Sequence, residues 1–146
     1  MPLLTFIAAV AVIGGLSALF YMTAMGRKLR ATSDSAQFVQ IVGIDPHKVF
    51  AIAMGLAFIV IGIAAFFMGV RANFDPSVGP ARLLFAFEAV VIGGLGSLWG
   101  TLAGGIILGV AQSIGAVIHP QYQILAGHLV FLVIILIRPR GLFPKQ

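Results

Sequence analysis

The chain contains no cysteine, few charges and no motif for nucleotide binding or nucleophilic catalysis. Without cysteine it has neither disulfides nor thiolate metal sites. It lacks a Gly-x-x-x-x-Gly-Lys-Ser/Thr motif, so it has no P-loop for ATP. Charged residues make up only 9% of the sequence, and hydrophobic residues make up 60%. A soluble domain of 146 residues does not bury that much apolar surface, so lipid must solvate it.

The first long apolar stretch, Leu3–Ala24, contains no charge. At about 1.5 Å per residue, a helix of this length spans roughly 30 Å, the thickness of the hydrocarbon core. A secretory signal peptide would instead have a basic n-region and a short apolar core, and neither is present. The stretch therefore predicts a transmembrane helix.

The positive charges cluster at the ends of the apolar stretches. Four of them bound the polar segment Gly26–Lys48 and three follow the last apolar run: Arg27, Lys28, Arg30 and Lys48, then Arg138, Arg140 and Lys145. Such clustering is the positive-inside pattern of membrane proteins, and it argues against a nucleic-acid partner. It predicts that Gly26–Lys48 and the C-terminus lie in the cytosol.

The alternation of apolar and polar stretches predicts about five transmembrane helices. Spans are expected at 3–25, 49–70 and 122–138, with a cytosolic loop at 26–48, an external loop at 71–82 and a cytosolic tail at 139–146. Segment 83–118 is long enough for two spans, but glycines interrupt it. Both its ends are expected outside, which suits either two spans broken near Gly93–Gly100 or a re-entrant hairpin. Two spans are the favoured interpretation.

The glycines follow regular spacings. Gly55, Gly62 and Gly69 recur every seven residues, and Gly96, Gly100 and Gly104 recur every four. Small residues at such spacings let helix backbones approach closely, and this packing drives association in lipid. The pattern is typical of a tightly packed bundle that slides between states, but also of ordinary membrane-helix packing. Five helices offer few partners for these faces, so further subunits are expected.

The polar segment Gly26–Lys48 contains a predicted short helix. Thr32 or Ser33 is a suitable N-cap, Gly43 is a suitable end, and Pro46 prevents direct continuation. An apolar face is formed at i, i+3 and i+4 by Phe38, Ile41 and Val42. Such a helix either rests on the lipid surface or docks into a groove of a soluble partner.

The same segment resembles the cytoplasmic loop of branched-chain amino acid ABC transporter permeases, a family with urea and short-chain amide relatives. The matching residues are Gly26, Arg27, Leu29, Arg30, Ala31, Thr32, Gly43 and Ile44. The stretch Phe87–Gly109 and the tail Arg138–Phe143 resemble the family's glycine-rich stretch and its Arg-Pro-x-Gly-Leu-Phe terminus. Family members are about twice as long, so the chain resembles their C-terminal half, either as a truncated or split permease or as a fragment.

The chain departs from the family pattern at three places. Gln37-Phe38-Val39 stands where Glu-Ala-Ala is frequent, so a neutral amide replaces a carboxylate that would pair with a basic residue of the ATPase. Trp99 stands where proline is common, and Glu88 stands where a small neutral residue is usual.

The resemblance implies an all-α integral membrane protein of the bacterial inner membrane. It has about five transmembrane helices, a short cytoplasmic coupling helix and a Gly-rich broken helical hairpin. The ATPase-coupling residues are then Arg30, Ala31, Thr32, Ser33, Gln37, Phe38, Ile41, Gly43 and Ile44. The candidate translocation path contains Glu88, Gly93, Gly94 and Gly96, and the helix-packing positions are Gly55, Gly62, Gly69, Gly100 and Gly104.

The implied partners are two ATP-hydrolysing subunits, a second permease, an external substrate-binding protein and, for a split permease, a separate N-terminal half. No cofactor is implied, and the chain itself is not expected to be an enzyme. Two other functions stay open. One is a truncated, non-transporting membrane interaction protein. The other is an ion-driven carrier. Such carriers generally need buried ionisable groups, and this chain offers few candidates, Glu88 and His128.

Two ionisable residues lie inside apolar segments. Glu88 either forms a polar contact in the translocation path, for instance to the ammonium group of an amino acid, or lies near the outer interface and snorkels there. His128 lies in the middle of a predicted span, and a hydrogen-bonded packing role is favoured over a proton relay.

Overall fold

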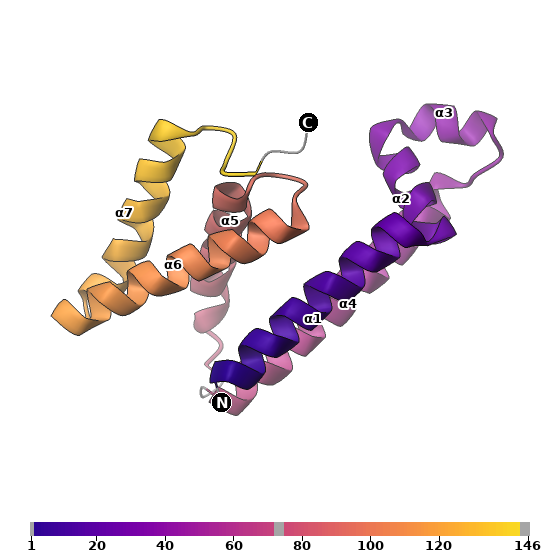
Figure 1. The fold of residues 1–146 in the computed structure, drawn as a ribbon. Coiled ribbons are helices and arrows are strands. Elements are labelled where there is room, and N and C mark those ends of the chain that lie inside the picture. The colour runs from indigo at the N-terminus through magenta and orange to yellow at the C-terminus, as the bar shows by residue number, and fades with distance from the viewer. Residues whose placement is uncertain (1, 72–74, 144–146) are drawn as a thin grey trace. The chain divides into compact units, whose positions relative to one another are not determined.

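The computed structural model describes residues 2–71 and 75–143, which form helices and connecting turns without a strand (Figure 1). The helices are α1 (Pro2–Met22), α2 (Ala24–Asp34), α3 (Ala36–Ile41), α4 (Pro46–Arg71), α5 (Val78–Gly93), α6 (Leu98–Ile118) and α7 (Tyr122–Ile137). Within the described ranges, three helices are long and apolar enough to cross a membrane: Leu3–Met22, Pro46–Arg71 and Leu98–Ile118. The helix α7 is apolar but shorter. The expected all-α membrane fold is confirmed.

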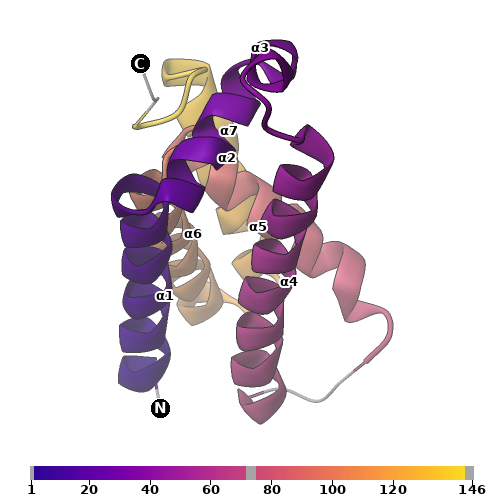
Figure 2. The same ribbon diagram turned by 90° about the vertical axis from the view of Figure 1, so that its right-hand side faces the viewer.

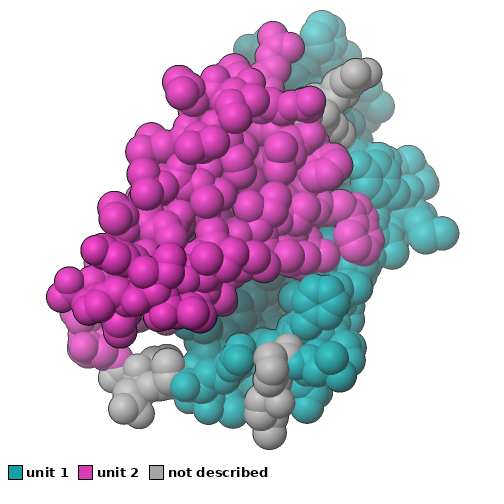
Figure 3. Space-filling model, turned by 60° about the vertical axis from the view of Figure 1, so that its left-hand side comes forward, with its two compact units in different colours: residues 1–74 teal, residues 75–146 magenta. Residues whose placement is uncertain are grey.

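The chain divides into two compact units, residues 1–74 and 75–146 (Figure 3). In the first unit, α1 and α4 are two separate columns joined at one end by α2 and α3 (Figure 2). The short helix α2 packs on both α1 and α4. Almost no residue of α1 and α4 is buried within the described part of the chain. Because these helices are apolar all round, lipid or neighbouring membrane helices must cover them.

The first span is shorter than expected, because α1 ends at Met22 and not at residue 25. The side chain of Thr23 caps the next helix by accepting a hydrogen bond from the backbone N–H of Gly26 at 3.1 Å. A Cβ at Gly26 would overlap the backbone of Leu19 and Phe20, so glycine permits the tight turn between α1 and α2.

The expected helix from Thr32 to Gly43 is wrong in its position, because two helices occupy the loop. The cap at Thr23 starts α2 upstream, and it continues to Asp34. Thr32 is no cap: its hydroxyl donates to the carbonyl of Lys28 within α2. The extended backbone of Ser35, with φ −159°, separates α2 from the six-residue α3.

The second span also begins earlier than expected. Pro46, and not Val49, is the first residue of α4. Proline suits a first helical turn, since the N–H that it lacks would have no partner within the helix there. The other end of α4 is Arg71, one residue beyond the expected boundary.

The second unit begins in the segment expected as an external loop, of which residues 72–74 lie outside the described ranges. Residues 78–82 of that expected loop are helical, because α5 begins at Val78. Before it, Asp75 accepts a hydrogen bond from the backbone N–H of Ser77 at 3.0 Å. This bond and one from the Ser77 hydroxyl hold the pKa of Asp75 below its usual value.

Segment 83–118 forms a broken helical hairpin. The break lies at Gly94–Ser97, between α5 and α6. Gly94 and Gly96 have φ values of 99° and 87°, which favour glycine, and the Ser97 hydroxyl caps α6 by accepting from the N–H of Gly100 at 3.0 Å. The helix α6 packs extensively on both α5 and α7, whereas α5 and α7 touch only lightly.

Candidate functional site

The residues expected to couple to an ATPase gather in the loop between α1 and α4. Helix α2 carries Arg30, Ala31, Thr32 and Ser33; α3 carries Gln37, Phe38 and Ile41; Gly43 and Ile44 follow. The structure thus places all of them in one loop. They lie on two helices, and some of them are buried whereas others are exposed.

The inner side of this loop is held by backbone and apolar contacts. Thr32 and Val39 are 3% and 6% exposed. The N–H of Ile44 donates to the carbonyl of Val39 at 3.1 Å and ends α3. The guanidinium of Arg30 lies 4.8 Å from the ring centroid of Tyr21, which ties α2 to α1. Arg30 and Thr32 therefore shape the loop from within.

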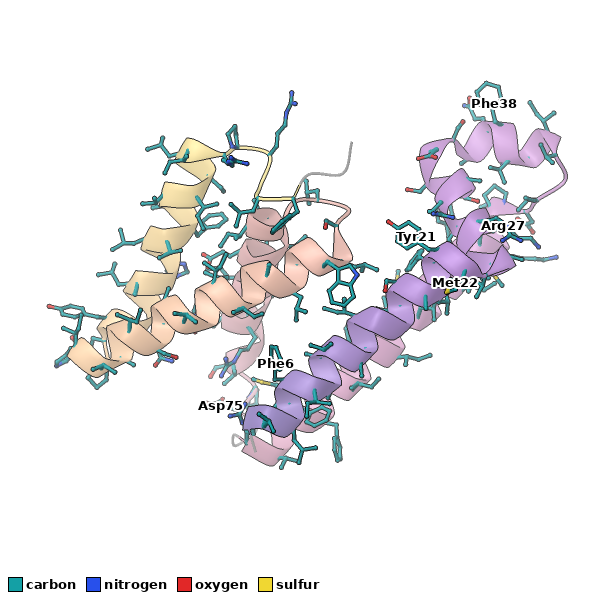
Figure 4. The ribbon with its side chains drawn as sticks, in the orientation of Figure 1. Phe6, Tyr21, Met22, Arg27, Phe38 and Asp75 are labelled. Carbon is teal, nitrogen blue, oxygen red and sulfur yellow. The ribbon has the colours of Figure 1, made fainter. Side chains whose placement is uncertain are left out.

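The outer side of α3 is an apolar face that is exposed in the described part of the first unit. Phe38, Ile41 and Val42 are 72%, 81% and 78% exposed. Figure 4 shows Phe38 pointing outward from α3. Beside this face is a groove of about 340 Å³, lined by Ala31, Asp34, Ser35, Phe38, Val39, Val42 and Ile44. An apolar face of this kind suits an apolar partner surface.

The α3 face differs from the exposed faces of α1 and α4 in its length and setting. The six residues of α3 are too few to cross a membrane, and the charged stretch Arg27–Arg30 precedes them. Phe38 is thus an apolar side chain carried on a polar loop. At the neighbouring position, Gln37 is the neutral amide that stands where the resembling permeases often have a glutamate.

The glycine-rich turn is closely packed. A Cβ at Gly93 would overlap the backbone of Gly100, and a Cβ at Gly104 would overlap the carbonyl of Ala89. Of the expected residues in this turn and at the start of α6, Gly93, Gly94, Gly100 and Gly104 are buried, whereas Gly96 is exposed. Glycines at these positions allow α5 and α6 to cross at backbone contact.

The C-terminal segment Arg138–Phe143 folds back onto this turn. The N–H of Leu142 donates to the carbonyl of Ile92 at 2.8 Å, and the N–H of Phe143 donates to that of Gly93 at 3.1 Å. These bonds satisfy carbonyls at the C-terminal end of α5, which lack partners within a helix. The tail was expected only as a cytosolic extension; residues 144–146, with Lys145, lie outside the described ranges.

Glu88 is buried and bonded to His128. Its side chain is 3% exposed, and Oε1 contacts Nδ1 of His128 on α7. Glu88 therefore does not snorkel to the outer interface, and that alternative is wrong. His128 is hydrogen-bonded as expected. Its ring stacks on Phe85 with a centroid distance of 5.5 Å.

Two of the three expected packing glycines on α4 face open space. A Cβ at Gly55 or Gly62 would meet nothing within 4 Å. Gly69 is half-buried. Gly55 and Gly62 are thus available to a neighbour, whereas Gly100 and Gly104 make close contacts within the second unit.

Two features were missed by sequence reasoning. The pairing of Glu88 with His128 joins residues 40 positions apart, and no periodicity predicts it. The role of the tail was hidden because backbone N–H groups make its bonds. A tail glycine gives a weak signal: Gly141 has φ 81° and lies against Gly94.

Comparison with known proteins gives one family for almost the whole chain. The family model described as branched-chain amino acid transport system / permease component matches residues 1–138. No solved structure matches the chain.

Curated relatives bear similar descriptions. The high-affinity branched-chain amino acid transport system permease protein BraD of Pseudomonas aeruginosa is 29% identical over 99% of this chain and 48% of its own length. The corresponding protein LivH of Escherichia coli is 27% identical over 83% of this chain and 40% of its own length. A probable permease protein LivH of Methanocaldococcus jannaschii is 31% identical over 75% and 35%. The chain spans about half the length of these relatives, or less.

Proposed function

The chain belongs to the family of branched-chain amino acid transport permease components, and we propose that it serves as a membrane-spanning component of an ABC importer. The substrate class is branched-chain amino acids or related small polar solutes such as urea and amides. ATP is hydrolysed on partner subunits, and the remaining partners are a second permease, an external substrate-binding protein and an N-terminal permease half.

One observation carries this proposal: the exposed apolar face of α3, formed by Phe38, Ile41 and Val42. It projects from a loop whose inner side is fixed by Thr32 and Val39. A face that is exposed on a rigidly held loop is suited to receive force from a soluble subunit. ATP-driven alternating access requires this face to bind differently in the two ATPase states, because equal binding would shift nothing.

The loop is also connected to the membrane helices on both sides. Helix α2 packs on α1 and on α4, so a push on the loop reaches both long helices of the first unit. The Thr23 cap and the Arg30–Tyr21 contact stiffen the link to α1. These contacts support a role of the loop in transmission as well as in docking.

We place the loop and the tail in the cytosol, following the positive charges at both. Because Leu142 and Phe143 are bonded to the end of α5, a cytosolic tail supports a cytosolic position for the turn Gly94–Ser97 as well. In this topology α5 runs inward and α6 outward. The arrangement supports two spans over a re-entrant hairpin in segment 83–118.

The translocation path is proposed to involve α5 and the turn after it, with Glu88, Gly93, Gly94 and Gly96. Because Glu88 is 2% exposed and bonded to His128, its part is to hold α5 against α7. Direct contact of Glu88 with the solute would first require that bond to open.

Co-purification tests the proposal against a non-transporting interaction protein. The chain is expressed with the ATPase encoded beside it and with an N-terminal permease half, and the ATPase is sought in the detergent eluate. Phe38→Asp places a charge in the apolar face and should abolish co-elution. Gln40→Asp adds the same charge to α3 outside this face and should preserve it. Absence of the ATPase from the wild-type eluate would contradict the proposal.

A further inference from the structure

Within the second unit, the light contact between α5 and α7 contains one polar pair. Nδ1 of His128 meets Oε1 of Glu88, and the ring of His128 stacks on Phe85, one turn from Glu88 on α5. Next to this pair, Gly127 lets the chain approach Gln112 of α6: a Cβ at Gly127 would lie 3.2 Å from the Gln112 amide nitrogen. The three helices thus meet at this level.

The other oxygen of Glu88 is buried without a hydrogen-bond partner in the described ranges. A carboxylate in this position has one oxygen that neither water nor protein solvates, which is unfavourable in an apolar surrounding. The stability of this contact therefore depends on the net charge of the two side chains together.

The three helices that meet at the pair carry few other ionisable residues. Helix α6 has no ionisable residue, α7 has only Tyr122 besides His128, and α5 has only Arg82 besides Glu88. Arg82 and Tyr122 are exposed and lie six residues from the pair members along their helices. The charge of the pair is thus balanced within the pair.

We propose that Glu88 and His128 form a proton-binding site that holds one proton within the membrane and fastens α7 to α5. With one proton, the pair is neutral, either as carboxylate with imidazolium or as carboxylic acid with imidazole. Loss of the proton leaves an uncompensated negative charge, and gain of a second leaves a positive one. Neither change requires another reactant than the proton itself.

The site predicts how stability depends on pH. In an unfolded chain, the imidazole loses its proton above about pH 6.5, so the two side chains then hold none, whereas the folded pair holds one. Folding therefore takes up one proton in this range, and stability falls as pH rises. The folding equilibrium constant should fall about tenfold per pH unit above about pH 6.5.

The first test is thermal unfolding of the full chain in lipid nanodiscs between about pH 6.5 and about pH 8.5. The wild type should lose apparent melting temperature as pH rises, relative to the double variant Glu88→Gln/His128→Gln. His47 and His119 are present in both proteins, so they do not produce a difference between the two profiles. Equal pH profiles for the two proteins would overturn the proposal.

The second test needs no variant. Nitrogen-15 NMR of the histidine rings in the wild-type chain follows the protonation of each ring. The signal of the His128 ring should stay unchanged between about pH 6.5 and about pH 8.5. A change of that signal over this range would overturn the proposal. Neither test involves an ATPase. Both tests can therefore fail while the importer assignment stands, and both can succeed if that assignment fails.

Discussion

Gly93 and Gly100 lie so close that a Cβ on Gly93 would overlap the backbone of Gly100, and a Cβ on Gly100 would overlap that of Gly93. This crossing, the cap at Ser97 and the returning tail hold the end of α5 at one place. The unit therefore has a closely packed end at the turn Gly94–Ser97.

The first prediction concerns two adjacent glycines of α6. Gly104→Ala should lower the free energy of unfolding by about 1–3 kcal/mol, because its methyl group would overlap the carbonyl of Ala89. Gly105→Ala is the control, since a Cβ there meets nothing within 4 Å. Denaturant unfolding in mixed micelles measures both. Equal loss in the two variants would show that the α5–α6 crossing does not cause the effect.

The second prediction concerns the tail. Leu142→Pro removes the N–H that donates to Ile92 and should cost about 0.5–1.5 kcal/mol of stability. Leu142→Ala keeps the N–H and serves as the control for the lost side chain. Hydrogen exchange of the α5–α6 turn should rise in the proline variant only. Unchanged exchange would show that the tail does not hold the turn.

The third prediction concerns the start of α2. Thr23→Ala removes the acceptor for the Gly26 N–H and should cost about 1 kcal/mol of local stability. Thr23→Ser retains a hydroxyl at the same position. Amide exchange at Gly26 should therefore accelerate about fivefold in the alanine variant and little in the serine variant. Slow exchange in both would contradict the assigned cap.

The fourth prediction concerns the open face of α4. Gly62→Leu adds a side chain where a Cβ meets nothing within 4 Å, so the helix content and melting temperature of the isolated chain should not fall. Assembly with the second permease or the N-terminal half should weaken if those subunits pack on the glycines. Size-exclusion chromatography of the co-expressed complex measures this. Full assembly of the variant would place the partner elsewhere.

Composition and hydropathy predicted the class of fold, because lipid imposes strong constraints on length and charge. The break in the glycine-rich segment was predictable, since Gly94 and Gly96 can adopt the positive φ angles that the turn requires and that other residues rarely adopt. Helix boundaries in the loop were not predictable: the sequence suggested Thr32 or Ser33 as the cap, whereas the structure uses Thr23. The exposed face of Phe38, Ile41 and Val42 followed from spacing alone.

The partners of Glu88 and Leu142 depended on tertiary structure. His128 and Glu88 come together because both α5 and α7 pack on α6. Leu142 binds through its backbone N–H, which every residue other than proline has. Neither contact leaves a distinct pattern in a single sequence.

The central claim is that the chain transports solute through force delivered at α3. The most direct measurement is ATP-dependent uptake of labelled leucine into proteoliposomes that contain the chain, an N-terminal permease half, the second permease, the ATPases and the binding protein. The wild type and Gln40→Asp should take up leucine, and Phe38→Asp should not. Uptake by Phe38→Asp at the wild-type rate, or no uptake by the complete wild-type assembly, would contradict the account.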